Sequence, residues 1–188
     1  RAAHPSGDAG GSAVGRTICA IVTVYGHSNG SLDGFTPVTS TTISLGEWDW
    51  EKQLWTSGSG SSQFSLFNIA STTPASLAAL LDVTGTSSTG DAGFSTTFNL
   101  ASYSLIAGGS STSYLASFTP SGMTSGTFTA TFTFNTADQE LPGKTAGTPL
   151  SLTATVVVVP EPATIALALG GVAMIGFAAA RRFRRRAA

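Results

Sequence analysis

Few side chains in this sequence could act as a nucleophile or a general base. The 188 residues include one cysteine, Cys19, and two histidines, His4 and His27. Cys19 and His27 could in principle pair as nucleophile and base. Cys19 lies in an apolar run, however, where a thiol more often packs as a small hydrophobic group, and His27 lies in a Gly-Ser-Asn-Gly turn context. We therefore expect no catalytic residues, and a single cysteine excludes an intrachain disulfide.

Metal ligands are equally sparse. Two histidines and one cysteine, widely spaced, do not make a transition-metal site. Asp91, Asp138 and Glu140 could offer oxygen atoms to calcium, but no loop is dense in Asp or Asn, which favours solvated loop carboxylates. We expect neither a metal nor any other cofactor.

The three tryptophans, Trp48, Trp50 and Trp55, are the sharpest candidate for ligand binding. Flat aromatic faces suit stacking on sugars, and Trp48 and Trp50 would share one face of an extended strand. Aromatic packing across a sheet edge is the favoured alternative. The three residues remain candidate glycan contacts.

The charged residues are distributed unevenly. The net charge is −1, yet five of the nine basic residues lie in the last eight positions. The first 159 residues therefore hold four basic groups against nine acidic ones. Such a body lacks the basic face that nucleic acid requires, so nucleic-acid binding is excluded. The clustered arginines are Arg181, Arg182, Arg184, Arg185 and Arg186.

The composition indicates an all-β, exported protein. Ser and Thr together number 52, Gly adds 22, and 10% of the residues are charged, against about 25% in ordinary soluble domains. With 41% hydrophobic residues the chain is not a disordered one. Threonine and alternating apolar residues are typical of strands with one wet face.

Strand patterns organise the body. Residues 127–135 and 150–159 alternate apolar and polar side chains with period two, which predicts half-buried strands of a sandwich. The long loop between them leaves both a Greek-key crossing and direct pairing open. Residues 77–83 fit either a strand or a helical turn. Weaker strands are predicted at residues 18–25, 41–45, 64–69, 94–100, 103–106 and 114–118.

The chain is predicted to have four parts. Residues 1–16 are small and polar and form a flexible arm, and residues 17–62 supply N-terminal strands and loops, either separate from the sandwich or part of it. Residues 63–159 form the sandwich, and residues 160–188 form a tail. No signal-peptide pattern opens the chain, so we expect that its natural start has been removed or lies upstream.

The tail has three successive parts. Pro160-Glu161-Pro162 must end the preceding strand, because proline donates no ladder hydrogen bond. Residues 163–180 carry no charge, and as a helix these 18 residues would be about 27 Å long, close to the roughly 30 Å hydrocarbon core of a membrane. The arginines that follow would stay on the cytoplasmic side. An ordinary anchor helix would explain the span and the charges, but not the position of Pro-Glu-Pro.

This tripartite order, from Val159-Pro160-Glu161-Pro162 through the apolar span to the arginines, resembles the PEP-CTERM sorting signal. That resemblance implies recognition by exosortase, a membrane-embedded cysteine transpeptidase, and cleavage near the motif. It also implies transient anchoring in the inner membrane, followed by transfer to the cell surface or the extracellular polymer matrix.

The body resembles bacterial immunoglobulin-like surface domains of the choice-of-anchor type. The features that match are spread over residues 63–159: a segment from Phe64 to Asn68, Ser88-Thr89-Gly90-Asp91, residues 105–111, residues 116–120 and residues 126–131. The resemblance implies a seven-strand immunoglobulin-like β-sandwich followed by a single C-terminal transmembrane helix. Together these expectations describe an exported, non-enzymatic surface or matrix protein. The alternative is a carbohydrate-binding module that uses its tryptophans on an exopolysaccharide.

Overall fold

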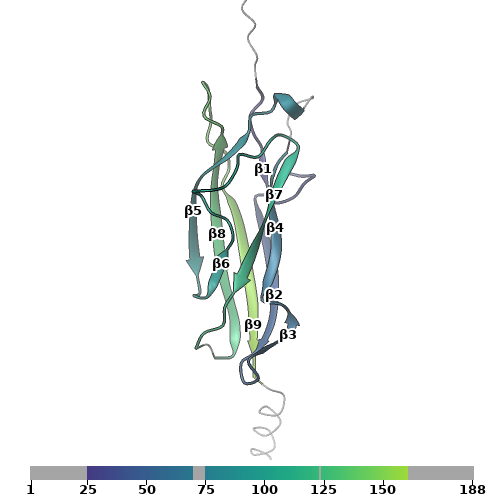
Figure 1. Ribbon diagram of the computed structural model, residues 1–188, viewed down its shortest axis with the longest axis vertical. Helices are drawn as coiled ribbons and strands as arrows, with labels where there is room; N and C mark the ends of the chain where they lie inside the picture. Colours follow the sequence, from purple (N-terminus) through teal and green to yellow (C-terminus); the bar gives the residue numbers. More distant parts are fainter. Residues whose placement is uncertain (1–24, 70–74, 123, 161–188) are drawn as a thin grey trace, which may run out of the picture.

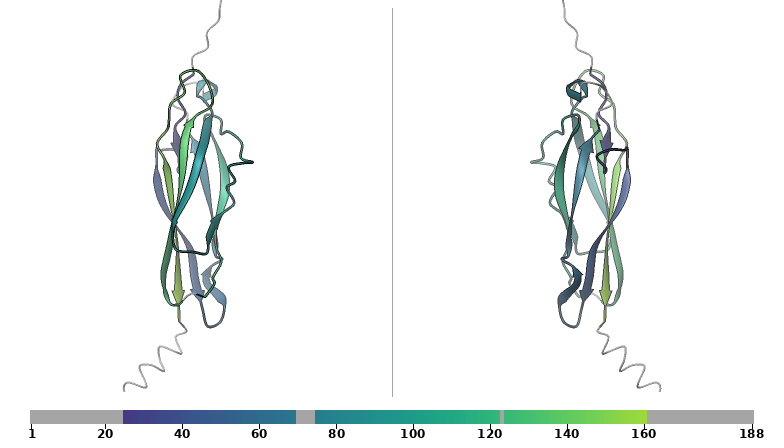
Figure 2. Two further views of the ribbon diagram at one scale, coloured as in Figure 1. Left: turned by 90° about the vertical axis from the view of Figure 1, so that its left-hand side faces the viewer. Right: turned by 90° about the vertical axis from the view of Figure 1, so that its right-hand side faces the viewer.

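The structure is a computed structural model that describes residues 25–69, 75–122 and 124–160. In this part of the chain, alternating apolar and polar residues form two facing sheets (Figures 1 and 2). One sheet has four strands in the order β1 (Gly30–Ser31), β4 (Ser61–Asn68), β7 (Ser110–Phe118) and β6 (Phe94–Thr96). The other has five, in the order β3 (Leu54–Gly58), β2 (Ser40–Asp49), β9 (Leu150–Val159), β8 (Gly126–Asp138) and β5 (Leu81–Gly90). The all-β prediction is confirmed.

The last strand, β9, lies in the centre of the five-stranded sheet. It pairs antiparallel with β8, from Phe134 opposite Leu150 to Gly126 opposite Val158. On its other side it pairs parallel with β2. Of the two topologies left open by the sequence, direct pairing of β8 and β9 is therefore the one adopted.

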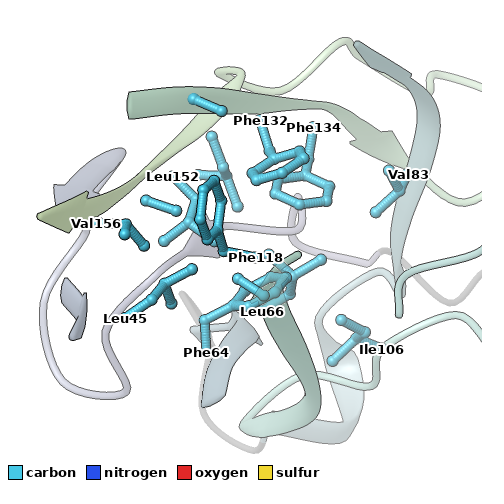
Figure 3. Close-up of a cluster of buried hydrophobic side chains, with 14 of the residues drawn as sticks. Leu45, Phe64, Leu66, Val83, Ile106, Phe118, Phe132, Phe134, Leu152 and Val156 are labelled. Carbon is cyan, nitrogen blue, oxygen red and sulfur yellow. The ribbon is translucent and has the colours of Figure 1, made fainter. Parts of the chain in front are cut away.

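The core lies between the two sheets. Along β9, alternate residues from Leu150 to Val158 are buried, and the residues between them are half-buried. The facing sheet contributes Phe64 and Leu66 from β4 and Phe118 from β7 (Figure 3). Side chains from both sheets thus interdigitate in one cluster, as in a two-layer sandwich.

Several strand boundaries differ from the prediction. Residues 77–83 divide between the two predicted structures, a 3-10 turn η1 (Ala75–Leu77) and the start of β5. The alternation at residues 94–100 gives only the three-residue strand β6, and residues 103–106 make a single bridge, between Ile106 and Leu81. The chain after β6 bridges β5 of the other sheet at Ile106 before it returns as β7, so long ladders do not form, although Phe98 and Tyr103 pack against the core.

The structure places residues 40–58 in the same sheet as β9, so these N-terminal strands are built into the sandwich. Residues 1–16, most of the predicted strand at 18–25 and the tail from residue 161 onward lie outside the described residues. Within the described ranges, none of the helical segments is long and apolar enough to cross a membrane.

Candidate functional site at the end of the last strand

The end of β9 is held in the sheet from both sides. Val158 lies opposite Trp48 of β2 and Gly126 of β8, and Val159 lies opposite Asp49. The backbone N–H of Trp50 then donates a hydrogen bond to the Val159 carbonyl at 3.4 Å. The chain is thus fixed as far as Val159, and Pro160 follows with no N–H to extend the ladder.

Asp49 shapes the turn beside this strand end. Its buried carboxylate accepts hydrogen bonds from the backbone N–H groups of Glu51 and Lys52, each at 3.0 Å, and the Lys52 ammonium lies 3.5 Å away. The Lys52 amide, helped by the Glu51 amide and the Lys52 charge, lowers the pKa of Asp49 against the opposing effect of burial. The Gln53 backbone has a positive φ of 54°, and its side-chain amide bonds the Trp50 carbonyl. The turn is therefore closed by its own polar groups, next to the point where β9 ends.

The three tryptophans do not form one exposed face. Trp48 and Trp55 pack edge to face with ring centroids 5.2 Å apart, and Trp55 in turn packs against the core residue Phe118 at 6.4 Å. Trp50 lies beyond the end of β2, in the turn, and is 42% exposed. Trp48 therefore lies within β2 and Trp50 directly after it, but both rings border one groove. Strand β2 ends at Asp49, between the two tryptophans.

A groove of about 300 Å³ lies beside the turn. Trp50 and Trp48 border it on one side, and the connection between β7 and β8 borders it on the other. Trp55 does not line it. The full lining consists of Trp48, Trp50, Gln53, Pro120, Ser121, Gly122 and Thr124.

A second polar cluster lies at the opposite end of the sandwich, around Asp138 at the end of β8 (Figure 1). Its carboxylate accepts hydrogen bonds from the Ser28 backbone N–H at 2.7 Å and the Ser28 hydroxyl at 2.8 Å. The Thr145 backbone N–H, at 3.1 Å, and hydroxyl, at 3.0 Å, are further donors. His27 Nδ1 lies 2.7 Å from the same carboxylate. Asp138 therefore ties the N-terminal segment at His27 and Ser28 to the loop that follows β8.

Burial alone would raise the pKa of the Asp138 carboxyl. The hydrogen bonds from His27, Ser28 and Thr145 outweigh that effect and hold the pKa well below its ordinary value. Asp138 is therefore ionised in the folded protein at neutral pH. A cavity of about 430 Å³ opens next to it, bordered by Tyr25, His27 and Lys144 among others.

The remaining candidate residues do not come together as a reactive set in the described part of the chain. His27 contacts Asp138, and Cys19 lies outside the described residues. Asp91 accepts a hydrogen bond from the Thr129 N–H at 2.7 Å, and Glu140 forms an ion pair with Lys144. Over residues 25–69, 75–122 and 124–160, no three His, Cys, Asp or Glu side chains are grouped closely enough to hold a metal ion.

Sequence reasoning missed the role of Asp49, and the favoured prediction of a solvated loop carboxylate is wrong for Asp138, which is buried at the end of β8. The role of Asp49 could have been predicted from the sequence, because an Asp side chain can accept hydrogen bonds from the backbone amides two and three residues later and so close a turn. The role of Asp138 could not, because its partners Ser28 and Thr145 come from separate loops.

Comparison with known protein families identifies the segment that follows β9. Residues 158–186 match the PEP-CTERM protein-sorting motif. No curated protein and no solved structure matches the chain. The match begins at Val158, inside β9, so the sorting motif and the sandwich share two residues.

The chain therefore carries an exosortase sorting signal, and the protein is an exosortase substrate. The motif implies that the protein is exported and anchored in a membrane before processing. Val159 and Pro160 lie at the end of β9 in the structure. Glu161, Pro162 and the arginines at 181, 182 and 184–186 fall within the matched segment but outside the described residues.

Proposed function

We propose that this protein is a non-enzymatic component of the cell surface or extracellular polymer matrix of an outer-membrane-bearing bacterium, delivered there by exosortase. The observation that carries the proposal is the position of the motif, which begins where the central strand of the sandwich ends. Cleavage after this strand separates the tail and leaves the sandwich whole. The sandwich then serves as a structural or adhesive module.

The outward faces of the sheets support this role. On the five-stranded sheet, Thr131 and Thr153 are joined across β8 and β9 at 3.1 Å. On the four-stranded sheet, Ser65 and Ser113 are joined across β4 and β7 at 2.8 Å. Such hydroxyl pairs keep a sheet surface hydrated without charge. An uncharged, hydroxyl-rich surface suits a hydrated matrix, and the same hydroxyls could accept O-linked glycans.

We further propose that the sandwich is immunoglobulin-like. The four-stranded order β1-β4-β7-β6 and the order β9-β8-β5 in the other sheet correspond to strands A-B-E-D and G-F-C of that fold. Antibody domains join strands B and F by a disulfide. Here the corresponding strands β4 and β8 are in contact through the rings of Phe64 and Phe134, whose centroids lie 5.7 Å apart at an interplanar angle of 36°.

In this proposal residues 163–180 span the inner membrane, and the arginines hold the C-terminus on the cytoplasmic side. Residues 163–180 carry no charge over 18 positions, which supports a membrane span. The Gly and Ala content of this segment makes it a marginal anchor, which suits temporary use.

The experiment is expression of the full chain with and without its exosortase, followed by intact-mass measurement and membrane fractionation. With the enzyme, the protein should lose its tail and leave the inner membrane. Pro160→Ala combined with Glu161→Ala should retain the tail. The matched control is Glu140→Ala combined with Pro142→Ala, which alters another Glu and Pro outside the motif, at the opposite end of the sandwich. Equal processing of all three chains would contradict the proposal.

The alternative function is carbohydrate binding, and the groove beside Trp50 is the observation that favours it. Trp48 also borders the groove but packs on Trp55, so Trp50 is the most exposed of the three rings to a sugar. A polysaccharide pull-down should then be abolished by Trp50→Ala and unaffected by Phe35→Ala, which removes another exposed aromatic ring. Unchanged binding in Trp50→Ala would remove this alternative.

A further inference from the structure

The end of the sandwich from which β9 leaves carries exposed apolar side chains. Trp50 is 42% exposed and Leu54 is 44% exposed, both at the turn between β2 and β3. Pro120 and Gly122, from the connection between β7 and β8, lie across the groove from Trp50. We call this surface, formed by Trp50, Leu54, Pro120 and Gly122, the exit surface. Figure 1 shows the β2–β3 turn and the end of β9 together at the lower end of the molecule.

The length of chain beyond β9 limits how far the exit surface can lie from a membrane. Three residues, 160–162, separate Val159 from the uncharged run. Even fully extended, the four steps from Val159 to residue 163 cover at most about 14 Å, at about 3.6 Å per residue. The headgroup layer on one side of a bilayer is itself roughly 5–7 Å thick. The end of β9 must therefore lie close to the lipid while the tail is in place.

The exit surface lies level with that strand end. Trp50 bonds the Val159 carbonyl through its backbone, so its side chain starts from the same height along the sandwich as the last residue of β9. Tryptophan prefers the headgroup level of a bilayer, where its apolar ring and polar N–H are both accommodated. The Asp49 turn holds Trp50 in place, which lowers the entropy lost on contact.

We propose that the exit surface rests on the lipid headgroup layer on the exported side of the membrane while the sorting tail is uncleaved. This inference rests on the proposed function, because the uncharged run must span the membrane. Contact comes from Trp50, Leu54 and Pro120. Lys52 is paired with Asp49, and Glu51 is adjacent, so the turn offers no excess of positive charge for acidic lipids. The contact is therefore apolar and independent of anionic lipid.

Fluorescence quenching of the full chain tests this contact. The chain is reconstituted into phosphatidylethanolamine vesicles whose acyl chains carry bromine near the headgroups, with and without phosphatidylglycerol. Bromolipid should remove most of the emission that Trp50 contributes, to the same extent in both lipid mixtures. Trp50→Phe should abolish that loss. Trp55→Phe is the matched control and should retain it, because Trp55 packs against Phe118. Thermal melts establish that each variant is folded.

The outcomes separate the two proposals. A chain that resists alkaline extraction from the vesicles but shows no Trp50 quenching would overturn the membrane contact and leave the anchoring intact. A chain that alkaline treatment extracts would overturn both. Quenching that depends on phosphatidylglycerol would overturn the apolar contact. A change in Trp50 emission when exopolysaccharide is added to the detergent-solubilised chain, with no quenching in vesicles, would assign the surface to a glycan instead.

Discussion

At the scale of single residues, buried carboxylates close the two ends of the sandwich. Asp49 closes the turn that presents Trp50, and Asp138 joins the segment at Ser28 to the loop at Thr145. Each carboxylate accepts hydrogen bonds from two backbone N–H groups, and such charge-assisted hydrogen bonds are stronger than neutral ones. An end built this way depends on the ionised form of one side chain.

Asp138→Asn should lower the free energy of unfolding by about 2 kcal/mol at neutral pH, because the amide replaces an ionised acceptor in a buried network. The pKa of Asp138 is lower in the folded protein than its ordinary value of 3.8. Its stabilisation is therefore complete above that pH and is lost as the pH falls below it. Denaturant melts at several pH values should show the difference from the natural protein shrinking below about pH 4.

Asp91→Asn is the control for this prediction. Asp91 is exposed and its carboxylate accepts one backbone hydrogen bond, from Thr129. Its replacement should therefore lower the free energy of unfolding by well under half as much as Asp138→Asn does. A difference between Asp138→Asn and the natural protein that stays constant down to acidic pH would contradict the assigned role of the carboxylate.

At the scale of elements, β2 contains an irregularity at Gly46 that lets it pair with two neighbouring strands. Its parallel register with β9 shifts between Ser44 and Gly46, and Gly46 has a φ of 119°. A Cβ at Gly46 would lie 2.0 Å from the Ser57 carbonyl oxygen of β3. The shift lets one strand pair with β3 and β9 while it bends toward the end where Trp50 lies.

Gly46→Ala should therefore destabilise the protein by at least about 2 kcal/mol, from the combined clash and backbone strain. Gly122→Ala is a matched control, since Gly122 also has a positive φ, 62°, but has nothing within 4 Å of the position of a Cβ. Gly122→Ala should lower the free energy of unfolding by about 1 kcal/mol, because it introduces backbone strain without a clash. Equal losses in chemical denaturation would show that the close approach of β2 and β3 is not maintained in solution.

At the scale of the whole molecule, the border between sandwich and sorting signal lies at the end of the central strand. Val156 and Val158 are buried between the sheets, whereas the Pro-Glu-Pro sequence follows the last paired residue. Removal of the tail therefore takes nothing from the core. We therefore expect the sandwich to keep its fold after processing.

A chain that ends after residue 162 should melt at the same temperature as the full chain. A chain that ends after residue 155 loses two buried valines and the end of the central strand, and its free energy of unfolding should fall by about 3 kcal/mol or more. Circular dichroism melts of the two chains measure the difference. Equal melting temperatures for both would contradict the placement of the border at Val159.

The sequence alone determined the all-β class, the strongest strands and the sorting signal. Each of these depends on the local sequence: the period-two alternation of apolar residues in β8 and β9, and the succession of Pro-Glu-Pro, an uncharged segment and the arginines. Only the tertiary structure decided which strands pair, because apolar alternation specifies a buried face but not a partner. It also separated the tryptophans, since a turn closed by Asp49 exposes Trp50 while Phe118 helps to cover Trp55.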